Sequence, residues 1–197
     1  MDFIRQQIEE SLKVRNLLLE DSVIQKSIRE AAAICSKSLK KGNKIIFAGN
    51  GGSAADAQHL AGELVNKFCF ERPGLAAIAI TTDTSVITSI SNDYGFDKLF
   101  ARQIEAIGKK GDVLVSLSTS GNSVNIIEGI KEARKAGIIA IGLTGKSGGR
   151  MSRLCDITIK VPSDETPRIQ EAHILIGHII CSSVENILFR NKEHSKK

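Results

Sequence analysis

A histidine and a glutamate lie four residues apart in the segment GNGGSAADAQHLAGE, residues 49–63. If this segment is helical, His59 and Glu63 share one face and can point at a common target. Such a pair is usually a solvated surface contact, but this helix would begin at a glycine turn, where a ligand can approach the backbone closely. The pair is therefore a candidate for acid–base chemistry or metal binding. Asp56 lies on the same side, and its role stays open between a ligand contact and a cap.

A second set of polar side chains interrupts a long apolar segment, residues 168–189, which reads RIQEAHILIGHIICSSVENILF. This pattern predicts a helix buried on all sides, yet the helix carries Gln170, His173 and His178. Unpaired buried polar groups cost about 1–3 kcal/mol each, so these side chains must meet hydrogen-bond partners, a metal or a substrate. For His178 a functional role is favoured, whereas His173 stays open between that and a structural hydrogen bond.

Together, these segments offer two imidazoles, one carboxylate and one amide oxygen, an acceptable ligand set for Zn²⁺. The set consists of His59, Glu63, Gln170 and His178. Gln170 and His178 are separated by about 12 Å of helix rise. They therefore converge on one ion only if both side chains extend toward it or if different subunits contribute. The apolar terminal helix and an apolar N-terminal helical hairpin, residues 1–40, both favour an oligomer with the site at a subunit interface.

The elements that must position these side chains alternate between strand and helix. Helical periodicity covers residues 3–40 as two amphipathic helices, and it returns at residues 53–68, 97–107, 122–136 and 168–189. Five short apolar runs are candidate strands: residues 44–48, 75–80, 113–117, 138–143 and 157–161. Such alternation predicts an α/β fold, a three-layer sandwich with a five-stranded parallel sheet covered by helices on both faces. In these sheets, ligands bind at the carboxyl ends of the strands near the point where the strand order reverses.

The turn after the first strand, Gly49-Asn50-Gly51-Gly52-Ser53-Ala54, fits the dinucleotide pattern G-x-G-x-x-G/A. An NAD-dependent enzyme is therefore one alternative. The pattern alone is weak, because the acidic residue expected about 20 positions later is missing and Asp83 lies further on. The other alternative is a tight glycine turn that admits a different ligand. Asp83 itself stays open between a ligand contact and a cap or turn acceptor.

The third strand runs into a hydroxyl-rich loop that reads STSGNS, residues 118–123, directly before a helix. A single hydroxyl would serve as an N-cap. Four hydroxyls beside the free N–H groups of one helix N-terminus favour a phosphate site.

Composition narrows the class of protein further. The chain has 197 residues, 42% of them apolar and 25% charged, which fits one globular domain. The net charge of +5 suits an anionic small molecule, but scattered cations and 4% aromatic residues do not suit nucleic acid. With no signal-peptide pattern and no apolar run of about 18 residues, we expect a cytoplasmic protein without a membrane partner. The four dispersed cysteines are expected to be buried thiols.

Five segments, in order along the chain, carry a family resemblance: GNGGSAADAQHLAGE, ERPGLAAIAITTD, SNDYGF, STSGNS and RIQEAHILIGH. With them the chain resembles the SIS-domain sugar isomerases, and among these the phosphoheptose isomerase family of bacteria. The resemblance implies a single SIS domain over residues 1–197 with a flavodoxin-like sheet. From the residues themselves, we expect the helical hairpin of residues 1–40 to serve oligomerisation and residues 192–197 to form a charged tail. The resemblance also implies a homotetramer with sites at subunit contacts and one Zn²⁺ per subunit.

The reaction implied is conversion of D-sedoheptulose 7-phosphate to D-glycero-D-manno-heptose 7-phosphate through an enediol, the first step toward activated heptose for lipopolysaccharide core or surface glycan. By this resemblance, the catalytic residues are Glu63 and His178, and the metal ligands are His59, Glu63, Gln170 and His178. The same resemblance assigns substrate contacts to Asn50, Gly51, Gly52, Ser53, Glu63, Asn92, Asp93, Ser118, Thr119, Ser120, Ser123 and Gln170. Metal ligation would compete with proton transfer, so either both catalytic residues leave the metal during turnover or the ion is partly structural.

One alternative within the same fold is a non-enzymatic protein that binds the bacterial replication initiator. That group shares the ERP and RIQE segments but departs from the isomerase pattern at the helical glutamate and at the last histidine. Glu63 and His178 are both present here, which favours the enzyme.

Overall fold

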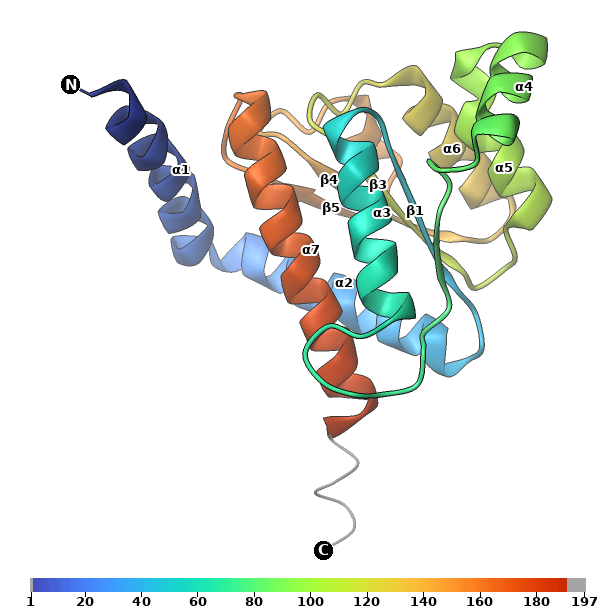
Figure 1. The fold of residues 1–197 in the computed structure, drawn as a ribbon, viewed down its shortest axis with the longest axis horizontal. Coiled ribbons are helices and arrows are strands. Elements are labelled where there is room, and N and C mark those ends of the chain that lie inside the picture. Colours follow the sequence, from blue (N-terminus) through green and yellow to red (C-terminus); the bar gives the residue numbers. More distant parts are fainter. Residues whose placement is uncertain (1, 191–197) are drawn as a thin grey trace, which may run out of the picture.

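The computed structural model describes residues 2–190, so the predicted charged tail, residues 192–197, lies outside the described part. Five parallel strands form one sheet in the order β2-β1-β3-β4-β5 (Figure 1). This is the flavodoxin-like order, and it confirms the predicted fold class. The strands are β1 Ile45–Gly49, β2 Ala77–Ala79, β3 Val113–Ser118, β4 Ile139–Thr144 and β5 Ile157–Lys160.

Helices cover both faces of the sheet (Figure 1). One apolar core joins the sheet to α2 (Ser22–Lys40), α3 (Gly52–Val65) and α7 (Thr166–Leu188). A second core lies between the other face and α4 (Thr84–Tyr94), α5 (Leu99–Ile107) and α6 (Val124–Lys135). Two 3₁₀ turns, η1 Phe96–Lys98 and η2 Arg150–Arg153, complete the connections.

The two cores arise from the two-residue period of the strands. In β1, Ile45 and Phe47 face the first core, whereas Ile46 and Ala48 face the second. Both sets are buried, which explains why this strand reads as a continuous apolar run rather than as an alternation of apolar and polar residues.

The order of the sheet brings two loops together. The chain leaves β1 toward β2 on one side and later returns to place β3 on the other side of β1, so the strand order reverses between β1 and β3. Gly49, the last residue of β1, pairs with Leu117 of β3. The glycine turn and the hydroxyl-rich loop therefore leave neighbouring strands at the switch point, where a ligand site is expected.

The two N-terminal helices meet at one residue. Asp21 ends α1 (Phe3–Glu20) and caps α2 by accepting from the N–H groups of Val23 and Ile24. In Figure 1 the two helices form an elbow, with α1 extending away from the sheet and α2 running behind α7 and α3. The outward residues Phe3, Ile4, Ile8 and Leu12 are all at least half exposed, so the α1 surface that was predicted to serve oligomerisation is apolar and uncovered in the single chain.

Several local predictions were wrong. The helix predicted over residues 53–68 ends already at Val65, which is 51% exposed because the chain turns away there. The terminal helix is not buried all round, since Ile179 is 42% exposed on its outer side. Cys69 is exposed and Cys155 is half-buried, so only Cys35 and Cys181 are the buried thiols expected.

Among the described residues no helix is long and apolar enough to cross a membrane.

One buried carboxylate lies at the amino ends of the strands, opposite the switch point. Asp112 is 1% exposed and accepts from the N–H groups of Lys44 and Lys109 at 3.0 and 2.9 Å. It also pairs with the ammonium group of Lys44 at 2.5 Å. Asp112 thus ties the start of β3 to the residue before β1.

We expect Asp112→Asn to lower the free energy of unfolding by about 1–3 kcal/mol, because the amide weakens a charged, buried hydrogen-bond set. Urea unfolding should show a lower midpoint with an unchanged slope. An unchanged midpoint would mean that this carboxylate does not hold the amino ends of these strands together.

Candidate active site and metal centre

The helices α3 and α7 lie side by side and run in the same direction (Figure 1). A glycine sets how closely they approach, because a Cβ on Gly177 would lie 2.5 Å from a methyl carbon of Leu60. Leu60 and Gly177 are both buried. A histidine neighbours each of them in sequence: His59 directly precedes Leu60, and His178 directly follows Gly177. The close contact of the two helices therefore brings the two imidazoles together.

The imidazoles meet at the outer edge of this contact. His59 Nε2 lies 2.8 Å from His178 Nε2 and 3.2 Å from Glu63 Oε1. The imidazole of His178 also packs against the ring of Phe68, with 5.2 Å between centroids. His59 and Glu63 remain accessible, with side chains 48% and 22% exposed. We call His59, Glu63 and His178 the acid–imidazole cluster.

The cluster has the donor atoms of a metal site. One potential ligand atom from each of the three residues lies within 4.8 Å of the others. Two imidazole nitrogens and a carboxylate oxygen suit Zn²⁺, and catalytic zinc sites typically keep three protein ligands and one open position. Three of the four predicted ligands therefore form a group that fits a divalent metal.

Gln170, the fourth predicted ligand, lies away from the acid–imidazole cluster. It precedes His178 by eight residues on α7, about 12 Å of helix. Its amide is placed over the start of α3, where a Cβ on Gly52 would come within 2.6 Å of Gln170 Nε2. Within one chain the structure joins Gln170 to the glycine turn rather than to the cluster.

The hydroxyl-rich loop surrounds the start of α6. Ser118 Oγ and Ser123 Oγ are 3.1 Å apart, and Ser120 Oγ accepts from the N–H of Asn122 at 3.1 Å. Gly121 turns the loop with φ of 65°. Within the described chain, Ser123 makes no side-chain capping bond to α6. In the first turn, the N–H of Ile126 donates to Asn125 Oδ1 at 2.9 Å. The N–H groups of Val124 and Asn125, for which no acceptor is found within residues 2–190, are left for another acceptor, as a phosphate site requires.

An amide pair that the sequence did not reveal links this loop to the glycine turn. Asn50 and Asn125 each donate from Nδ2 to the other's Oδ1 at 2.9 Å. Asn125 is 3% exposed and lies in the first turn of α6. The only sign of this pair in the sequence is that Asn125, a polar residue, occupies a core-facing position of α6. Beside Asn50, Gly51 has φ of 55° and Ser53 is buried.

Asn92 and Asp93 lie at the exposed end of α4, where Asn92 Nδ2 donates to Asp93 Oδ1 at 2.8 Å. No hydrogen bond within residues 2–190 joins either of them to the cluster or to the hydroxyl-rich loop. Their predicted contact with substrate therefore stays a prediction.

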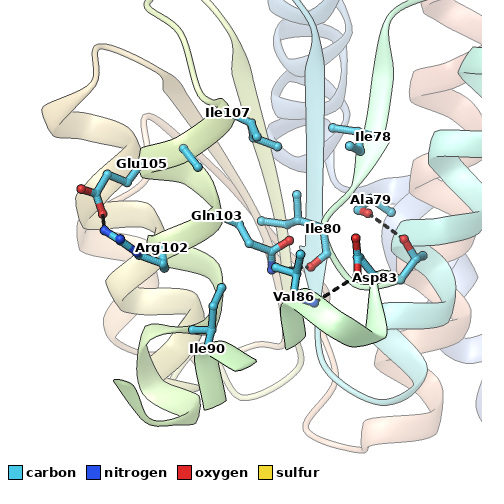
Figure 2. A pocket seen from close by; sticks show the side chains of 12 residues that line it. Ile78, Ala79, Ile80, Asp83, Val86, Ile90, Arg102, Gln103, Glu105 and Ile107 are labelled. Atoms are coloured by element: carbon cyan, nitrogen blue, oxygen red, sulfur yellow. Dashed lines mark hydrogen bonds and ion pairs between the residues drawn. The ribbon is translucent and has the colours of Figure 1, made fainter. Parts of the chain in front are cut away.

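A cavity of about 520 Å³ lies between β2, α4 and α5 (Figure 2). Its wall is mainly apolar and contains none of the predicted catalytic or metal-binding residues. Asp83 is on its rim, where its carboxylate accepts from the N–H of Val86 at 3.0 Å. Asp83 is thus the N-cap of α4, which settles the choice that the sequence left open.

Two further residues have perturbed environments. Burial raises the pKa of Asp56, an effect that the nearby His59 opposes. Burial lowers the pKa of His173 to about 4, against a smaller opposing effect of the Thr144 backbone. His173 is completely buried, and within residues 2–190 neither ring nitrogen has a partner in hydrogen-bond geometry. It is therefore a neutral imidazole at physiological pH, one turn beyond Gln170.

Residues 13–145 match the SIS domain family. This match, together with the fold and the cluster, defines the class of protein. Over its full length the chain is 55% identical to a phosphoheptose isomerase from Aneurinibacillus thermoaerophilus, covering 99% of that protein. It is also similar to solved structures of phosphoheptose isomerases. For the protein from Neisseria gonorrhoeae the TM-score is 0.86 at 41% identity, over 93% of this chain and 97% of the other. For the protein from Francisella tularensis the TM-score is 0.90 at 38% identity, over 94% of this chain and 97% of the other.

The chain therefore belongs to the phosphoheptose isomerase family of SIS-domain proteins, and it is an isomerase. These relatives favour the enzyme over the initiator-binding and NAD-dependent alternatives.

We expect Gly177→Ala to separate α3 from α7, because the new methyl group would overlap Leu60. Overpacking of this kind costs about 1–3 kcal/mol of stability. It should also weaken binding of a divalent metal to the cluster, measured by titrating the metal-free protein in competition with a chromophoric chelator.

Gly62→Ala is the matched control, since Gly62 lies on α3 with no atom near its would-be Cβ. This substitution should leave stability equal or slightly higher and metal affinity unchanged. If the two variants bind metal equally well, the close approach of the helices does not shape the site.

Proposed function

We propose that this chain converts D-sedoheptulose 7-phosphate to D-glycero-D-manno-heptose 7-phosphate, with the acid–imidazole cluster acting on C1 and C2. The observation that carries the proposal is the convergence of Glu63 and His178 from helices far apart in sequence onto one accessible point. Moving a carbonyl between adjacent carbons needs a base for a carbon-bound proton and a second group for the oxygen-bound protons. The cluster contains one of each.

In the proposed reaction, the carboxylate of Glu63 takes a proton from C1 of the open-chain ketose. His178 donates a proton to the C2 oxygen and accepts the proton of the C1 hydroxyl. Glu63 then returns its proton to C2, which leaves the aldose and restores both side chains. His59, in contact with both groups, orients them.

We also propose that the cluster binds one Zn²⁺ per subunit through His59, Glu63 and His178, with Gln170 as a further ligand or substrate contact. The ion would stabilise the negative charge that develops on the enediol oxygens if Glu63 and His178 are released from it during turnover, and otherwise its role would be partly structural. Support comes from the donor set and its accessibility.

The phosphate end of the substrate is assigned to the hydroxyl-rich loop. The N–H groups of Val124 and Asn125 at the start of α6 would donate to the phosphate together with the loop hydroxyls, which are those of Ser118, Thr119, Ser120 and Ser123. The glycine turn lies between this loop and the cluster and would contact the sugar hydroxyls through Asn50, Gly51, Gly52 and Ser53. Asn92 and Asp93 are proposed to contact the open chain from α4.

The same proposal includes a homotetramer with sites at subunit contacts. His59 follows Gly52 by about 10 Å of helix, so cluster and phosphate loop are well separated in one chain. The uncovered apolar residues of α1 and Ile179 of α7 support an assembly. Because sugar phosphates are cytoplasmic metabolites, the proposal places the enzyme in the cytoplasm, at the start of activated heptose synthesis for lipopolysaccharide core or surface glycan.

We expect the wild-type protein to isomerise D-sedoheptulose 7-phosphate, and Glu63→Gln to lose this activity by about 10²-fold or more, because the amide cannot take the carbon proton. Product formation is followed by NMR with and without a chelator, and the chelator should also slow the wild type.

Glu71→Gln is the control, since Glu71 is an exposed carboxylate whose partner is Lys67. It should turn over normally. Near-normal turnover by a folded Glu63→Gln protein would remove Glu63 as the base, and absence of turnover by the wild type would reject the proposed reaction.

We expect Ser120→Ala to raise KM by about tenfold to a hundredfold, the cost of one hydrogen bond to a charged group, with little change in kcat. Steady-state kinetics of this variant and of Ser27→Ala, a serine on α2, provide the comparison. An unchanged KM would move the phosphate site away from this loop.

A further inference from the structure

A buried ion pair lies near the acid–imidazole cluster and is not used by the proposed reaction. Arg72 Nε donates to Glu185 Oε1 at 2.8 Å, and the side chains are 1% and 0% exposed. Arg72 belongs to the loop after α3, and Glu185 lies on α7, seven residues beyond His178. The pair therefore connects the end of the helix that carries Glu63 with the helix that carries His178.

The guanidinium of Arg72 also holds the C-terminal end of α3. Its Nη2 donates to the backbone carbonyl of Glu63 at 2.8 Å, and its Nη1 donates to that of Leu64 at 2.7 Å and of Asn66 at 3.1 Å. The last carbonyls of a helix have no partner within the helix, and a cation is favoured at that end. Arg72 thus fixes the backbone of Glu63 itself.

The carboxylate of Glu185 holds the loop in the same way. Glu185 Oε1 accepts from the N–H of Phe68, and Oε2 accepts from the N–H of Cys69, both at 2.8 Å. Phe68 in turn packs its ring against His178. One connected set of hydrogen bonds therefore reaches from the backbone of Glu63 to Phe68, whose ring supports His178.

We propose that Arg72 and Glu185 are positioning residues that keep Glu63 and His178 in register for proton transfer and metal binding. This inference rests on the proposed roles of Glu63 and His178. Buried ion pairs are poor stabilisers, because desolvation offsets most of their attraction, and apolar replacements of both partners are often neutral. Fixing two helices at a set distance and rotation is a task that an apolar pair, which lacks directional bonds, does less well.

The test compares Arg72→Met, Glu185→Gln and the double variant. Each single variant should lower kcat by about tenfold or more, since small displacements of catalytic groups have effects of this size or larger, with KM changed by less than about twofold. Each should also weaken metal binding to the metal-free protein. In the double variant the unfolding midpoint should recover in part, because no unpaired charge is left, while kcat and metal affinity stay low.

Asp112→Asn is the matched control, since Asp112 is also a buried carboxylate that accepts from two backbone N–H groups and one cation, but at the opposite edge of the sheet. It should lose stability and keep kcat and metal affinity. If the Glu185→Gln protein loses stability as Asp112→Asn does and likewise keeps kcat and metal affinity, the pair is merely structural. Recovery of kcat together with stability in the double variant would overturn the proposal as well.

Metal binding separates this inference from the proposed function. A Glu63→Gln protein with normal turnover would reject the base assignment, whereas the effect of Arg72 and Glu185 on metal affinity would still be measured directly.

Discussion

Everything that the site can do depends on how closely two helices approach. The 2.8 Å contact between His59 and His178 joins residues 119 positions apart, and it exists because Gly177 presents no side chain to Leu60. With larger residues at this crossing, the same histidines would stand on separate surfaces. The cluster is thus a property of backbone packing first and of side-chain chemistry second, and the neighbouring ion pair of Arg72 and Glu185 fixes the same two helices further along.

In the proposed function, the chain separates the two tasks of a phosphosugar enzyme in space. The phosphate end would be bound by backbone N–H groups and hydroxyls at the switch point of the sheet, whereas the reacting end would be served by titratable side chains further along α3 and α7. The glycine turn lies between them, and the Asn50–Asn125 pair ties this turn to the first turn of α6. An open-chain sugar has the same division, with its carbonyl at one end and its phosphate at the other.

The layers, the strands and the pairing of His59 with Glu63 were accessible from the sequence, because periodicity and spacing report local structure. The ligand chemistry of the two segments suggested that this pair meets His178, and the resemblance to a family assigned the same residues. The helix α4 was not predicted: its residues TSVITSISNDY are rich in β-branched and hydroxyl side chains that have low helix propensity. Asn125, Arg72 and Glu185 were missed because their partners are distant in sequence. Glu185 carried one usable signal, since a carboxylate in an apolar helix requires a partner. For Gln170, by contrast, the sequence was sufficient: the helix rise between Gln170 and His178 predicted that the two side chains lie apart within one chain, as they do in the structure.

The parallel sheet has a consequence that reaches beyond individual contacts. Because every strand points the same way, α3 and α6 both begin at the carboxyl edge of the sheet, and α7 starts beside α3, with Gln170 over Gly52. Three partial positive charges from peptide dipoles therefore gather at one rim. An anion approaching that rim meets a favourable field before it touches any side chain. The shared direction of the strands thus favours negatively charged metabolites at this rim.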